Sequence, residues 1–176
     1  TVTCVMYVGG LDQIVENFYV TGAVNTIDGV VLACARTTIS NVWSDYSRRG
    51  FYAFQPYICT FNRLIAKNAS QTAFDFSSAS GKTSLIFNNC TCENVANGFL
   101  LSVCYYSVMN ACAADYVNYT ATGNPYGVGY GDRASSNAIY QFDGGDVVMN
   151  GCGTENSYGN GIVGFIYPKR INPFME

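Results

Sequence analysis

Three carboxylates recur at one position of similar segments, and their types and spacing suit acid–base chemistry. Glu93, Asp115 and Glu155 are each the eighth residue of the segments "IFNNCTCEN", "VMNACAADY" and "VMNGCGTEN". Asp45 and Lys67 occupy the same position in "TISNVWSDY" and "TFNRLIAKN", and these five residues are called the acidic column below. Hydrolysis of a glycosidic bond needs two carboxyl groups, one acting as acid and one as base or nucleophile. The column therefore predicts a catalytic face, provided that the fold stacks the segments side by side.

The five segments belong to a repeat of short β-type runs. Their third residues are 22, 26, 22 and 40 residues apart, and a second series of apolar runs, such as "GVVLA", "GFYAF" and "GFLLS", alternates with them. Helical repeats need a 3.6-residue periodicity and about 33 to 47 residues. The regular leucines of leucine-rich repeats are absent from the sequence. A parallel β-helix fits, because each unit can form one coil whose strands pair with the next coil about 4.8 Å away.

Alternation of side chains along a strand assigns three columns to the narrow interior of this β-helix. They hold the second, fifth and seventh residues of the segments: Ile39, Phe61, Phe87, Met109 and Met149; Val42, Leu64, Cys90, Cys112 and Cys152; Ser44, Ala66, Cys92, Ala114 and Thr154. The third residues are expected to form the turn, because Asn tolerates a left-handed conformation, and to stack as an amide ladder. They are Ser40, Asn62, Asn88, Asn110 and Asn150.

The acidic column then points outward, with Glu93, Asp115 and Glu155 on consecutive rungs. Like charges at this spacing repel, so that one carboxyl of a pair keeps its proton more firmly than the other, as acid–base catalysis requires. We expect Glu93, the carboxylate nearest Lys67, to be the general acid, and Asp115 or Glu155 to be the base that activates water. The alternative is that these charges only solvate the outer face.

The unit between Asn110 and Asn150 is longer than the others, and its surplus falls in "YTATGNPYGVGYGDRASS", residues 119–136. Long excursions from a compact scaffold are commonly functional. Tyr rings can stack on sugars, and Asp and Arg can bond sugar hydroxyls, so this loop is expected to hold a sugar chain together with Lys67. The loop residues concerned are Tyr126, Tyr130, Asp132 and Arg133. The alternative is a decorative loop or a contact within a trimer.

Composition narrows the classes of function. Apolar residues make up 49% and charged residues 12%, and the net charge of −3 leaves no basic stripe, so neither disorder nor nucleic-acid binding is expected. No apolar run approaches the roughly 20 residues that span a bilayer, so no membrane insertion is expected. Eight cysteines without a CxxC pair or a histidine predict reduced thiols rather than a metal site, and we expect no cofactor. Reduced thiols indicate synthesis in a reducing cytoplasm.

Two units, "GFLLSVCYYSVMNACAADYVN" and "AIYQFDGGDVVMNGCGTENSYGNGI", resemble the coils of bacteriophage tailspike and capsule-depolymerase β-helices. The resemblance covers roughly residues 29–165. It implies a homotrimer on the tail of a phage virion, made in bacterial cytoplasm, that binds a capsular or O-antigen polysaccharide as host receptor and cleaves it. It carries over no catalytic motif, since tailspikes place their carboxylates variably.

We therefore predict one all-β segment, residues 1–176, taken from a longer chain. It is expected to form a right-handed parallel β-helix of about six coils with a lateral loop at 119–136. The expected function is a tailspike glycosidase, with outward aromatics such as Trp43 and Tyr52 as trimer contacts. The alternatives are a non-catalytic structural or adhesive segment, and a polysaccharide lyase that would use Lys67 beside Glu93.

Overall fold

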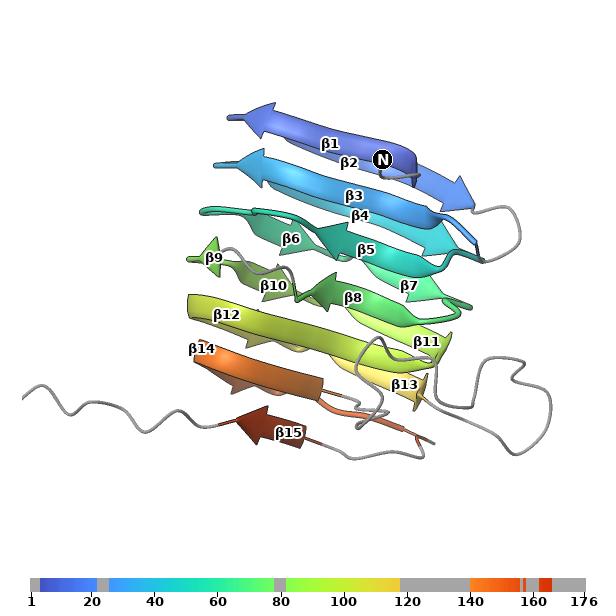
Figure 1. Cartoon of the computed structure of the whole chain (residues 1–176), viewed down its shortest axis with the longest axis vertical. Coiled ribbons are helices and arrows are strands. Elements are labelled where there is room, and N and C mark those ends of the chain that lie inside the picture. The colour runs from blue at the N-terminus through green and yellow to red at the C-terminus, as the bar shows by residue number, and fades with distance from the viewer. Residues whose placement is uncertain are drawn as a thin grey trace, which may run out of the picture.

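The computed structural model describes residues 4–21, 26–77, 82–117, 140–155, 157 and 162–165. Within these residues there are fifteen strands and no α-helix, and all the strands join one sheet through parallel pairing. The chain winds so that each strand pairs with its counterpart in the next coil, as the stacked ribbons of Figure 1 show. The prediction of an all-β parallel β-helix is confirmed.

Two series of strands form the two sides of the stack. The front series in Figure 1 holds β1 (Cys4–Leu11), β3 (Asp28–Ala35), β5 (Arg49–Ala53), β8 (Thr72–Phe76), β12 (Asn97–Asn110), β14 (Tyr140–Asn150) and β15 (Ile162–Phe165). The series behind it holds β2 (Ile14–Thr21), β4 (Thr38–Asp45), β6 (Thr60–Asn62), β7 (Ile65–Lys67), β10 (Ile86–Asn88), β11 (Thr91–Val95) and β13 (Ala113–Val117). The short strand β9 (Lys82–Thr83) pairs with β12, which continues from the first series into the second and pairs there with β10.

The closed part of the stack is slightly shorter than the predicted six coils. Of the described residues, those between 28 and 117 form about four coils that have paired coils on both sides. The strands β1 and β2 form one end of the described stack, and β14 and β15 form the other. Of the described residues, those of β1 and β2 and those near Asn150 are less buried than their counterparts in the central coils.

The register stacks the sequence repeats directly on one another. Phe61 pairs with Ile39 on one side and with Phe87 on the other, and Phe87 pairs in turn with Met109. In the four central coils the three predicted interior columns are at most 1% exposed, which confirms the assignment of faces. The same columns are less buried in the coil of β14, where Thr154 is exposed.

Aromatic stacking fills the interior of the front series. The Phe51 and Phe74 rings lie 5.1 Å apart with planes 7° from parallel, and the Phe74 and Phe99 rings lie 4.4 Å apart and 3° from parallel. All three side chains are fully buried. Burial of a Phe side chain contributes about 1.5–3 kcal/mol to the free energy of folding, so this stack strongly stabilises the packing of neighbouring coils.

The predicted amide ladder is present. The Asn62 Nδ2 donates to the Ser40 Oγ at 3.2 Å, and the Asn88 Nδ2 donates to the Asn62 Oδ1 at 2.9 Å. The Asn110 and Asn150 amides continue the ladder, each donating to the preceding Asn at 2.9 Å. Every inner member of the ladder therefore both donates and accepts along the stack.

The prediction that these Asn residues take the left-handed turn is wrong by one position. The left-handed residues are the next ones along the chain: Asn41, Arg63, Asn89, Ala111 and Gly151. A ladder Asn must stay extended, because it still pairs in the sheet, as Asn88 does with Asn62 and Asn110. The corner falls on the following residue, whose N–H continues the coil-to-coil bonding: the Asn89 N–H donates to the Asn110 carbonyl at 2.9 Å.

The cysteines of the interior column are unbridged, as predicted. Cys90, Cys112 and Cys152 each direct the thiol at a carbonyl of the adjacent coil, the Phe61, Phe87 and Met109 oxygens at 3.5–3.6 Å. Cys90 and Cys112 are fully buried, whereas Cys152 at the end of the stack is half-buried. In this column Cys acts as a small apolar residue with a weak donor.

Candidate functional site

The acidic column lies on one outer face of the coil, as the sequence predicts. Lys67 pairs in register with Asp45 on one side and with Glu93 on the other, and Glu93 pairs with Asp115. The Glu155 N–H donates to the Asp115 Oδ1 at 2.8 Å, so Glu155 follows on the next coil. The neighbouring Cys92 and Ala114 are buried, which leaves the column pointing outward.

Two charges of the column, Lys67 and Glu93, form an ion pair. The Lys67 Nζ lies 2.6 Å from the Glu93 Oε2, and both side chains are nearly half exposed. The Asp45 carboxylate accepts bonds from the Tyr19 hydroxyl at 3.1 Å and from the Asn68 Nδ2 at 2.8 Å. The bond and the negative charge of Asp45 raise the pKa of Tyr19. The column thus contains one ion pair, and Asp45 is bound by residues beside the column.

A second outward column runs beside the acidic one and changes in size along the stack. It begins with Tyr19 and Trp43, whose rings lie 6.4 Å apart at 63° and are largely exposed. It continues through Ile65 to Thr91, Ala113 and Gly153, which pair in order. Small residues therefore flank Glu93, Asp115 and Glu155, and an aromatic pair lies further along the same face.

The structure separates the predicted site residues into two groups. Glu93, Asp115, Glu155 and Lys67 come together on one face. The predicted loop at 119–136, with Tyr126, Tyr130, Asp132 and Arg133, lies outside the described residues, so its part in the site stays a prediction. Of the two aromatics expected at an interface, Trp43 is about half exposed, whereas the Arg49 guanidinium lies 3.4 Å over the Tyr52 ring and covers it.

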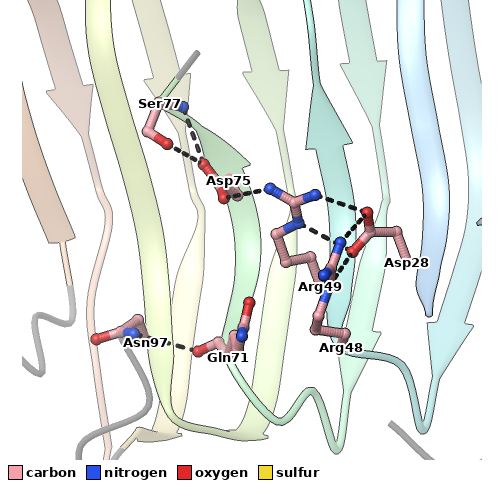
Figure 2. A network of polar contacts seen from close by, with 7 residues as sticks. All are labelled: Asp28, Arg48, Arg49, Gln71, Asp75, Ser77 and Asn97. Carbon is pink, nitrogen blue, oxygen red and sulfur yellow. Dashed lines mark hydrogen bonds and ion pairs between the residues drawn. The ribbon is translucent and has the colours of Figure 1, made fainter. Parts of the chain in front are cut away.

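Sequence reasoning missed a network of buried charges, which Figure 2 shows. Arg48 and Arg49 each donate two bonds to the Asp28 carboxylate, at 2.6–3.0 Å. The Arg49 Nη1 also donates to the Asp75 Oδ2 at 3.2 Å, and the Ser77 N–H donates to the Asp75 Oδ1 at 3.0 Å. All four carboxylate oxygens accept bonds, so the network ties β3, β5 and β8 together rather than leaving a group to bind a ligand.

The charges of this network stabilise one another in a dry environment. Asp28 is fully buried and Asp75 almost so. Burial raises the pKa of Asp28, but the bonds and charges of Arg49 and Arg48 outweigh it, and the net pKa lies below the usual value. Burial likewise opposes the charge of Arg49, yet Asp28 and Asp75 raise its pKa overall. The signal in the sequence was the isolated Asp75 inside the apolar run "TAFDF".

One lysine is also buried near this region. Lys82 in β9 is fully buried, and its Nζ donates to the Ser102 carbonyl at 3.0 Å. Burial lowers its pKa, partly offset by Cys104 and Asp75. In the part of the chain that the structure describes, no group of three or more Cys, Asp or Glu side chains is arranged to hold a metal ion.

Comparison with known proteins gives no relative: no family model, no curated protein and no solved structure matches this chain. Among the described residues, no helix is long and apolar enough to cross a membrane. The parallel β-helix and the surface chemistry of its coils are therefore the basis for a proposal about function.

Proposed function

We propose that this chain is a segment of a phage tailspike, made in bacterial cytoplasm, that binds and hydrolyses a bacterial capsular or O-antigen polysaccharide. The observation that carries the proposal is the alignment of Glu93, Asp115 and Glu155 on consecutive coils, outward and flanked by small residues. Two carboxyl groups about 5–5.5 Å apart suit a retaining glycosidase, and a separation of about 6.5–9.5 Å suits an inverting one. Neighbouring coils about 4.8 Å apart approach the first spacing, and alternate coils approach the second.

The contacts of the column suggest how its members could share the roles. The Glu93 Oε2 lies 2.6 Å from the Lys67 Nζ, so an ammonium group already contacts one of its two oxygens. In the proposal Glu93 acts as nucleophile or base, in place of the acid role expected from the sequence. Asp115 or Glu155 then supplies the proton to the leaving group. Lys67 orients Glu93 and contacts sugar hydroxyls.

The aromatic pair supports binding of an extended sugar chain on the same face. Tyr19 and Trp43 present large exposed rings in line with the small residues that flank the carboxylates. The apolar faces of sugar rings pack on such side chains, while the acidic column offers acceptors for hydroxyl groups. A polysaccharide lying along the stack would cross several coils and contact both features.

A second candidate function is binding or scaffolding without catalysis. The observation that favours it is that Asp45, Lys67, Glu93 and Asp115 all contact other residues of the chain. Such contacts also stabilise a solvated face. A lyase is a weaker alternative, because the Lys67 ammonium that would serve it is paired with Glu93.

The test is depolymerisation by the full-length protein. It is incubated with a panel of capsular and O-antigen polysaccharides, and both new reducing ends and the ultraviolet absorbance of unsaturated products are measured. Glu93→Gln, Asp115→Asn and Glu155→Gln should include at least one loss of about 100-fold or more in turnover with binding retained. Glu16→Gln, which changes an exposed carboxylate of β2 outside the column, is the matched control. Wild-type turnover in all three column variants would refute catalysis on this face, and binding without any product would favour the second candidate.

A further inference from the structure

We propose that Cys34 and Cys59 are a redox-active pair that a hydroperoxide converts into a disulfide between two neighbouring coils. Their Sγ atoms lie 3.9 Å apart, which is van der Waals contact between two sulfurs. Cys34 lies near the end of β3, before the corner of its coil, and Cys59 lies just after the corner of the next coil and before β6. The proposal does not depend on the function of the acidic column.

The contact between the Cys34 and Cys59 sulfurs joins two neighbouring coils. The Cys59 thiol also lies 3.5 Å from the Cys34 carbonyl oxygen and 3.4 Å from the Tyr57 carbonyl oxygen, much as the stacked Cys90, Cys112 and Cys152 thiols lie against carbonyls. A disulfide needs the two sulfurs at about 2.05 Å. A side-chain movement of about 2 Å therefore closes the bond, without a change in which strands pair.

The two thiols differ in reactivity. The bond from the Cys34 thiol and the nearby backbone groups of Thr37, Tyr57 and Arg36 outweigh burial and lower the pKa of Cys59 to about 7. The pKa of Cys34 is raised by its bond to Cys59 and by burial. Because Cys59 directly follows the half-exposed corner residues Tyr57 and Ile58, an oxidant that enters there meets it first, so Cys59 is the attacking thiol and Cys34 the resolving one.

Access to the pair comes through the corner that precedes Cys59. Both cysteines are buried, at 2% and 0% exposure, so the oxidant must reach them through local opening. Residues 54–59 connect β5 to β6 and form two isolated bridges, from Tyr57 to Ala35 and to Thr83 in the adjoining coils. Phe54, Tyr57 and Ile58 are about half exposed. A segment with so little strand pairing belongs to the part of a fold that opens most readily.

The reaction balances with a hydroperoxide as the oxidant. The Cys59 thiolate attacks one peroxide oxygen, the O–O bond breaks, and the leaving oxygen takes up a proton, which leaves a sulfenic acid on Cys59. The Cys34 sulfur then attacks the Cys59 sulfur. The S–S bond forms as the S–O bond breaks, and hydroxide leaves as water with the Cys34 proton. Two thiols lose two electrons and two protons, and hydrogen peroxide becomes two water molecules.

The product would link residues 34 and 59 across two coils. The link would hold the corner that precedes β6 against the end of β3, in addition to the backbone bonds of Tyr57 with Cys34 and Arg36. The oxidised protein should therefore unfold at a higher temperature than the reduced one. This gain should disappear when a dithiol reductant is added.

The experiment uses the fully reduced protein treated with hydrogen peroxide. After denaturation, an alkylating reagent should modify six of the eight cysteines. Non-reducing peptide mapping should find one linked pair, Cys34 with Cys59. Cys34→Ala should stop the reaction at the sulfenic acid, which a 1,3-diketone traps on Cys59. Cys104→Ala, a change at a buried cysteine outside the pair, should leave the link intact.

Several results would overturn the proposal. They are retention of all eight thiols, a link between any other two cysteines, and oxygen adducts on Cys59 of the wild type without a link. A diketone adduct on Cys34 of the Cys59→Ala variant would overturn the assigned order of attack. The peptide map of the wild-type protein decides the central point even if a variant fails to fold.

Discussion

Removal of the Asp28 carboxylate should destabilise the fold strongly. Asp28 accepts four bonds from Arg48 and Arg49, at 2.6–3.0 Å, and is fully buried. Breaking a buried pair by deleting one partner costs about 3–5 kcal/mol, because the other charge stays buried. The Arg48 side chain is 36% exposed and can turn to water, whereas Arg49 is 12% exposed and keeps Asp75. We therefore expect Asp28→Ala to lower the free energy of unfolding by about 3 kcal/mol, the lower end of that range.

Asp12→Ala is the matched control. Arg36 donates to Asp12 at 2.7 and 2.6 Å with the same two-bond geometry, but both side chains are about half exposed or more. Exposed pairs contribute little to stability. Urea denaturation followed by circular dichroism measures both variants. Equal losses of unfolding free energy in the two variants would refute the argument that the Asp28 network stabilises the fold because it is buried.

The same network should make stability depend on pH in a defined direction. The folded-state pKa of Asp28 is lowered, while an unfolded Asp titrates near about 3.9. Its contribution is therefore present above about pH 4–5 and is lost as the pH falls through the folded-state pKa. The difference in unfolding free energy between the wild type and Asp28→Asn should shrink below about pH 4. A difference that stays constant from pH 7 to pH 3 would contradict the lowered pKa.

Two further predictions concern the ladder and the assembly. Asn110→Ala removes two hydrogen bonds of 2.9 Å between side-chain amides and should lower the free energy of unfolding by about 1–3 kcal/mol, as measured by urea denaturation. Asn150→Ala removes one exposed hydrogen bond and should lower it less. Equal losses would argue against a cooperative ladder. The full-length protein should give a trimer mass in light scattering, since closed symmetric association is expected of a tailspike and Trp43 offers an exposed aromatic contact. A monomer mass at micromolar concentration would contradict the proposed assembly.

The sequence predicts the coils well because the same residue types recur at the same interior positions. Ile39, Phe61, Phe87 and Met109 occupy one column in the structure as they do in the alignment of the segments. A narrow interior allows few side-chain sizes, so the constraint is visible in every repeat. The position of the corner was missed by one residue, because the amide ladder needs an extended backbone and the left-handed residue can then be Arg63 or Ala111.

Features that break the repeat could not be predicted in this way. The network of Asp28, Arg49 and Asp75 joins residues from different positions of three coils, so no column of the alignment reveals it. The Cys34 and Cys59 contact likewise crosses a corner and joins unlike positions. Both depend on how irregular connections between strands fold, and side-chain periodicity carries no information about those connections.

The most direct test of the proposed function is a crystal structure of the protein with an oligosaccharide from the polysaccharide that it binds. The account predicts that the sugar chain lies along the stack on the outer face of β7, β11 and β13. A glycosidic oxygen should lie within hydrogen-bond reach of two of the carboxylates Glu93, Asp115 and Glu155. An oligosaccharide bound on a different face, with the acidic column in contact only with solvent, would contradict the account.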